Sequence, residues 1–102
     1  MSMTVLAMAT ARRNVVERIA RFLDDLERDG REPGHWQGDQ VRHALAALER
    51  GNYPAGEDAM MRAERPDLFR SSVLANRRAA RLSEVPTLAN LRASLARLQA
   101  DD

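Results

Sequence analysis

Three side chains that commonly bind metal ions, His35, Asp39 and His43, follow one another at intervals of four residues. On a continuous helix this spacing would present two imidazoles and a carboxylate on one face, a set that could hold a divalent metal. Gly34 and Gly38 interrupt the stretch, and Asp39 is well suited to capping a helix that begins after it. We therefore predict no metal site and interpret both histidines as partly exposed polar residues.

No other group of residues has the composition of a catalytic site. An acidic cluster is interleaved with arginines, which is typical of a solvated face and not of a general acid and base in a dry cleft: Asp24, Asp25, Glu27 and Asp29. No histidine and no glycine-flanked turn accompanies the later serines, Ser71, Ser72, Ser83 and Ser94. Cysteine is absent, which excludes thiolate catalysis, disulfides and cysteine-based zinc sites. We predict a protein that is not an enzyme and that uses no cofactor.

All 16 basic residues are arginine, and 15 acidic residues reduce the net charge to +1. Exclusive use of arginine is typical of a GC-rich bacterial genome, and it also suits bidentate contacts to phosphate or carboxylate. One predicted helix carries an arginine stripe that could contact the phosphates of DNA or RNA: Arg70, Arg77, Arg78 and Arg81. Leu74 falls within this stripe, and no aromatic residue accompanies it for base stacking. Nucleic-acid binding through the stripe is therefore our second hypothesis.

Apolar residues recur every three or four positions along most of the chain, which is typical of helices that pack on one another. The clearest case is a leucine series near the C-terminus, at 88, 91, 95 and 98. Gly30 and Gly51 are suited to ending helices, and Asp39, Asn52 and Thr87 to beginning them. We predict five helices, from residue 4 or 10 to 29, from 39 to 50, from 52 to 63, from 66 to 82 and from 87 to about 100, with a loop at 31–38.

These elements predict an all-α fold, a compact bundle of about five helices in which the first and the last are the long ones. A chain of 102 residues has the size of one domain, so we expect a single helical domain over residues 1–102. Its ends, at residues 1–3 and 100–102, are expected to fray, because the C-terminal aspartates lie at the unfavourable end of a helix dipole.

A short segment resembles the turn and second helix of a tetratricopeptide repeat, through Gly51, Asn52, Tyr53, Gly56, Met60 and Ala63. Gly56 stands where that family prefers alanine. No second copy of the segment occurs in the chain, and such solenoids bury a core only by stacking several repeats. We therefore do not assign the chain to this family.

Residues 1–10 are mostly apolar, but Arg12 and Arg13 follow them, which reverses the order of a secretory signal. No window reaches the roughly 18 apolar residues of a membrane span. We expect a cytoplasmic protein that does not bind membranes.

Without a catalytic group, the helix surfaces are the expected functional parts. Apolar residues in loops and on charged faces, together with one arginine, suit a contact with another protein: Trp36, Tyr53, Met61, Leu74 and Arg77. Trp36 is either a lid over the core or an anchor of that contact. The first hypothesis is a non-catalytic adaptor, inhibitor or antitoxin-like regulator. Because a small core is often supplemented by a second copy, we also expect self-association as a homodimer or larger oligomer.

Overall fold

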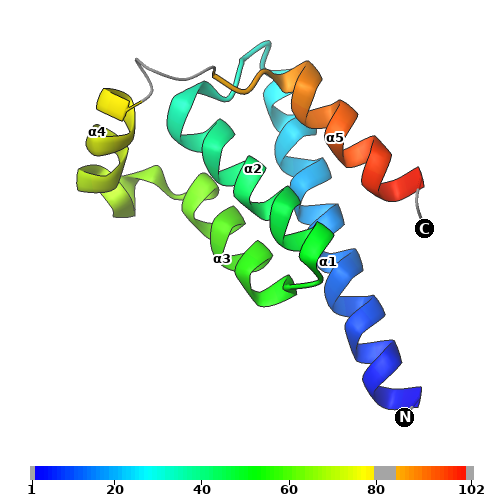
Figure 1. Ribbon diagram of the computed structural model, residues 1–102. Coiled ribbons are helices and arrows are strands. Elements are labelled where there is room, and N and C mark those ends of the chain that lie inside the picture. Colours follow the sequence, from blue (N-terminus) through cyan, green and yellow to red (C-terminus); the bar gives the residue numbers. More distant parts are fainter. Residues whose placement is uncertain (1, 80–84, 101–102) are drawn as a thin grey trace.

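The computed structural model describes residues 2–79 and 85–100, and every regular element in this part of the chain is a helix (Figure 1). Four helices pack together: α1 (Ser2–Arg28), α2 (Gly34–Arg50), α3 (Tyr53–Glu64) and α5 (Leu88–Ala100). The 3₁₀ turn η1 (Pro66–Phe69) leads from α3 into α4 (Arg70–Ala79), which lies to one side. The predicted all-α bundle of five helices is confirmed. Within these residues, no helix is long and apolar enough to cross a membrane.

The core forms where α2, α3 and α5 cover one face of α1. From α1, the side chains of Val15, Ile19 and Leu23 are fully buried. The leucine series of α5 completes the core, because Leu91 and Leu95 are buried in it while Leu88 and Leu98 pack against it. The other helices contribute Val41, Ala44, Leu45 and Leu48 from α2, and Ala59, Met60 and Ala63 from α3. The three- and four-residue spacing of the sequence thus corresponds to real buried faces.

Several predicted helix ends are confirmed by their hydrogen bonds. Gly30 and Gly51 adopt left-handed conformations, with φ of 64° and 75°. At the start of α3, Oδ1 of Asn52 accepts a hydrogen bond from the amide of Ala55 at 3.2 Å. At the start of α5, Oγ1 of Thr87 accepts one from the amide of Asn90 at 3.1 Å. These side chains satisfy amides that the first turn of a helix leaves unpaired.

The predicted start of α2 is wrong by five residues, because α2 begins at Gly34 and Asp39 lies inside it. Pro33 occupies the N-cap position, so the predicted loop over residues 31–38 is much shorter. Gly38 is buried in the helix, and a Cβ added there would lie 3.2 Å from Cβ of Pro86. The glycine that suggested a loop therefore permits a close approach between α2 and the chain before α5.

The predicted helix over residues 66–82 is also wrong in its first turn, which is the separate 3₁₀ turn η1. Its predicted end falls in residues 80–84, which lie outside the described residues, as do residues 1 and 101–102 of the predicted frayed ends. The long elements are α1 and α2, with 27 and 17 residues, whereas α5 has 13. The last helix is therefore not one of the two longest.

Candidate protein-interaction surface

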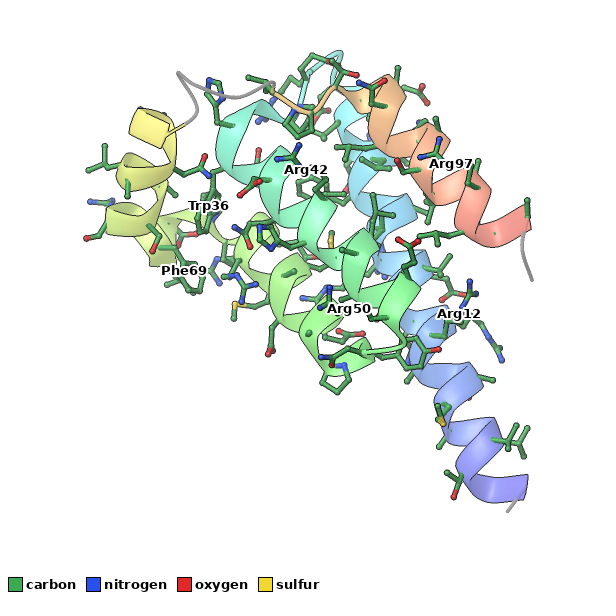
Figure 2. All side chains as sticks on the ribbon, viewed as in Figure 1. Arg12, Trp36, Arg42, Arg50, Phe69 and Arg97 are labelled. Atoms are coloured by element: carbon green, nitrogen blue, oxygen red, sulfur yellow. The ribbon has the colours of Figure 1, made fainter. Side chains whose placement is uncertain are left out.

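Trp36 joins the start of α2 to η1. Its ring stacks on that of Phe69, with centroids 6.2 Å apart and planes at 30° (Figure 2). Its Nε1 donates a hydrogen bond to the carbonyl oxygen of Arg62 at 3.1 Å, and Nε2 of the adjacent Gln37 donates to that of Ala63 at 3.0 Å. Because Trp36 is half-buried in these contacts, it fixes the position of η1 and offers only part of its ring to a partner.

A polar contact beside Trp36 holds the end of α3 on α2. Gln40 is buried, and its Oε1 accepts a hydrogen bond from Nε of Arg62 at 2.8 Å. A buried amide oxygen without a partner would cost free energy, so this contact fixes both side chains. The last turn of α3 and the turn η1 that follows it are thus anchored on the bundle.

Beyond this anchor, three large apolar side chains are exposed on consecutive elements. The exposed fractions are 37% for Met61 of α3, 60% for Leu68 of η1 and 57% for Leu74 of α4. We call these residues, with Arg70 and Arg77 of α4, the α4 surface. Leu68 was missed by the sequence analysis, because its exposure follows from the 3₁₀ turn that replaces the predicted helix.

The α4 surface carries positive charge. Arg70 and Arg77 are exposed and form no hydrogen bond or ion pair with the residues that the structure describes. Nearby, Arg65 binds both carboxylate oxygens of Asp67 at 3.1 and 2.8 Å, and these bonds lower the pKa of Asp67. The local acidic group is thus already neutralised by Arg65. Of the remaining arginine stripe, Arg81 and the side chain of Arg78 lie outside the described residues.

Helix α4 itself is attached by few contacts. None of its described side chains is buried, and only Val73 and Asn76 are half-buried. Nδ2 of Asn76 donates a hydrogen bond to Oδ2 of Asp39 at 3.3 Å, while Oδ1 of Asn76 is buried without a partner. Such an element rests on the bundle without contributing to its core.

We expected Gly34 and Gly38 to interrupt the helix, but His35, Asp39 and His43 all lie on the continuous helix α2. The structure nevertheless shows no group of three or more potential metal ligands among the described residues. The carboxylate of Asp39 instead accepts a hydrogen bond from Arg42 at 2.9 Å, and Nε2 of His43 lies 3.4 Å from it. Asp39 therefore connects residues of α2 to α4.

Tyr53 does not belong to the α4 surface. It begins α3 and packs against the core, whereas Met61 lies two turns later on the same helix. At 1.5 Å per residue the two positions are about 12 Å apart along the helix axis. Of the five predicted partner-binding residues, Met61, Leu74 and Arg77 are exposed on α3 and α4. Trp36 is half-buried against Phe69, and Tyr53 packs against the core.

The acidic cluster of α1 serves a contact between helices. Nη2 of Arg92, on α5, donates hydrogen bonds to Asp24 at 2.7 Å and to Glu27 at 3.1 Å. The bond to Asp24 is the main cause of the raised pKa of Arg92. Asp25 pairs with Arg28 of its own helix at 2.6 Å. Asp24 and Glu27 therefore link α1 to α5 through Arg92 on the surface of the bundle.

A shallow cavity of about 350 Å³ lies between α2 and α5. Arg42 and Arg97 point toward this side of the molecule (Figure 2). The lining also includes Glu49, and Nη2 of Arg97 donates to Oγ of Ser94 at 3.0 Å. Because Glu49 borders the cavity together with the two arginines, its charge is mixed, and we take the α4 surface as the candidate site.

Comparisons of the sequence with protein-family models and curated proteins, and of the structure with solved structures, find no match. The function is therefore inferred from the surfaces of this chain alone.

Proposed function

We propose that this protein is a small non-catalytic interaction module, an adaptor, inhibitor or antitoxin-like regulator, that binds a partner protein through the α4 surface. The supporting observation is the exposure of Met61, Leu68 and Leu74 on elements held at the edge of the bundle. Single exposed apolar residues are common on proteins, but a group of large ones is typical of an interaction site.

The partner is expected to present an apolar face bordered by carboxylates. Leu68 and Leu74 would be buried in the contact, and the flexible side chain of Met61 would adapt to its shape. Arg77, which is exposed and forms no ion pair in the described structure, would meet the carboxylates together with the exposed Arg70, whose charge also acts on Asp67. A cytoplasmic location is part of this proposal.

Site-specific photocrosslinking in cells of the source organism tests the proposal. A benzophenone amino acid at position 74 should give a discrete adduct with one other protein, and the same probe at the exposed Ala93 of α5 should not. Leu68→Glu should abolish the adduct, because it places a carboxylate in the apolar contact while leaving the core intact. Equal adducts from positions 74 and 93, or an adduct that survives Leu68→Glu, would contradict the proposal.

Nucleic-acid binding is the second candidate function, supported by the exposure of Arg70 and Arg77 on α4. Fluorescence anisotropy with labelled duplex DNA and RNA would distinguish it from protein binding. Under this alternative, affinity would fall with salt by a logarithmic slope of about 0.9 for each phosphate contacted on DNA. The double variant Arg70→Ala, Arg77→Ala would reduce that slope by up to about two. No binding at low salt would eliminate this candidate.

A further inference from the structure

The N-terminal end of α1 has no cover in the described part of the chain. It projects beyond the ends of α3 and α5, at the opposite end of the molecule from α4 (Figure 1). Residues 4–10 are all exposed, and the exposed fractions of Val5, Leu6 and Met8 are 65%, 65% and 52%. We call residues 4–11 the N-terminal arm. The arm leaves large apolar side chains in water, which is unfavourable for an isolated helix end.

The arm continues the same face of α1 that forms the core. Successive positions on this face are three, four, three and four residues apart: Val5, Met8, Arg12, Val15 and Ile19. Val15 and Ile19 are fully buried under the other helices, and Val5 and Met8 extend their line beyond the bundle. Alternating spacing of three and four is the pattern by which two helices interlock their side chains.

We propose that a second copy of this chain covers the arm, with the two arms antiparallel about a twofold axis. Residues 2–11 carry no charged side chain, and no other stretch of the sequence as long lacks one. The surface in this chain that best matches the arm is therefore the arm itself. A closed twofold contact uses the same patch on both copies, so Val5 and Met8 of both chains are buried in it, whereas Leu6, about 100° around the helix from Val5, lies outside it.

The spacing also fixes the register of the pair. In an antiparallel arrangement Val5 of each copy faces Met8 of the other, and the two contacts are related by the twofold axis. Arg12 is the next residue on this face and marks the end of its apolar part. Nη2 of Arg12 donates a hydrogen bond to the carbonyl oxygen of Leu98 at 3.1 Å, which turns its charge toward α5.

A concavity at the base of the arm extends the contact. It has a volume of about 550 Å³ and lies between the base of the arm and the end of α5, and its lining combines Ala9 and Val16 with Gln99 and two arginines, Arg12 and Arg13. A stable complex buries about 800 Å² on each partner. A short arm is expected to bury less, so we include the apolar part of this concavity, Ala9 and Val16, in the proposed contact. The proposed interface is thus small, and we expect the dimer to dissociate as the protein is diluted.

Sedimentation equilibrium of the full chain tests the proposal. The mass should rise with concentration from 11.4 kDa toward twice that value. Val5→Glu and Met8→Glu should each weaken association by about tenfold or more, because a carboxylate enters the apolar contact. Ala7→Glu and Thr10→Glu are matched controls on the opposite side of the arm, and each should change the dissociation constant by less than about threefold.

The absence of cysteine makes the register testable by disulfide formation. When chains with Val5→Cys are mixed with chains of different tag size that carry Met8→Cys, the mixed disulfide should form faster than either symmetric one. Thr10→Cys should form none at the same concentration. Preferential linkage of two Val5→Cys chains would overturn the antiparallel register.

Two outcomes would overturn the dimer itself. One is a constant mass of 11.4 kDa across the concentration range. The other is equal weakening by Val5→Glu and Ala7→Glu, which would mean that the arm is surrounded on all sides. Cosedimentation with vesicles of anionic lipid, lost equally in both variants, would then assign the arm to a lipid surface.

Discussion

Helices α3 and α4 are consecutive and similar in length, with 12 and 10 residues, but they are attached to the bundle in different ways. The buried positions of α3 are Gly56, Ala59, Met60 and Ala63, whereas α4 has none among its described side chains. The sequence explains the difference. The buried positions of α3 are adjacent or three apart, so they form one face. Of the four apolar residues of α4, three are consecutive: Val73, Leu74 and Ala75. Three consecutive residues point over about 200° of a helix, so they cannot all be buried.

Charge reinforces the same difference. Arg18 of α1 donates to both carboxylate oxygens of Glu64, with Nε–Oε2 at 2.9 Å and Nη2–Oε1 at 2.6 Å, and to Glu57 at 2.5 Å. The bonds to Glu64 are the largest cause of the raised pKa of Arg18. Among the described side chains of α4, the corresponding polar contact is the Asn76–Asp39 hydrogen bond. In this protein α3 is fixed to the core, whereas the loosely attached α4 carries the surface that we propose for binding.

The largest effect is expected from the core side of α3. Met60→Ala should lower the free energy of unfolding by about 3 kcal/mol, because Met60 is fully buried and its removal leaves a cavity. Urea denaturation followed by circular dichroism at 222 nm measures the loss. A loss below about 1 kcal/mol would mean that the core closes around the smaller side chain.

Next in size is the loss of the ion pairs between α1 and α3. Arg18→Met should lower the free energy of unfolding by about 2 kcal/mol, because it keeps the aliphatic stem but leaves Glu57 and Glu64 without their cation. Arg13→Met is the control, since Arg13 is exposed on the same helix and forms no ion pair within the described structure. If thermal melts show equal losses for both variants, the ion pairs contribute nothing specific.

A smaller effect is expected where α3 approaches α1 most closely. A Cβ at Gly56 would lie 3.0 Å from Cγ1 of Val15, which is itself fully buried. Gly56→Ala should therefore destabilise the protein by about 1 kcal/mol, with the strain partly offset by the better helix propensity of alanine. In a Val15→Ala background the same substitution should be neutral or stabilising. If the losses of the two substitutions are additive, the destabilisation by Gly56→Ala does not come from contact with Val15.

The smallest effect on stability is expected at the outer side of α4. Leu74→Ser should change the free energy of unfolding by less than about 0.5 kcal/mol, because the side chain is largely exposed. Urea denaturation of Leu74→Ser and of Met60→Ala under the same conditions compares the two helices directly. A loss near that of Met60→Ala would show that α4 is part of the cooperative core.

The sequence predicts the fold well where local chemistry decides it. Gly30, Gly51, Asn52 and Thr87 mark the predicted helix ends, because the left-handed turn or side-chain cap that each supplies depends only on neighbouring residues. The buried face of α5 is likewise visible in the spacing of its leucines. These features depend only on residues that are close together in the chain, so a single sequence is enough to predict them.

The prediction fails where a distant residue decides the outcome. Gly38 indicates a loop by its type, yet it lies inside α2, where the absence of a side chain leaves room for Pro86. The split of the predicted helix at Phe69 accompanies the stacking of its ring on Trp36. The exposure of Leu68 and of the N-terminal arm depends on where neighbouring helices end. For the candidate site, the sequence therefore indicated Met61, Leu74 and Arg77 but gave no reason to separate them from Tyr53.

Trp36 is the only tryptophan of the chain, and its indole is placed at the joint between the bundle and η1. Its emission spectrum therefore reports on this joint without any added label. Binding of a partner at the α4 surface should alter the polarity around the indole and shift the wavelength of maximal emission. Association through the N-terminal arm should leave that wavelength unchanged. The fluorescence of Trp36 can thus distinguish binding at the α4 surface from association at the N-terminal arm.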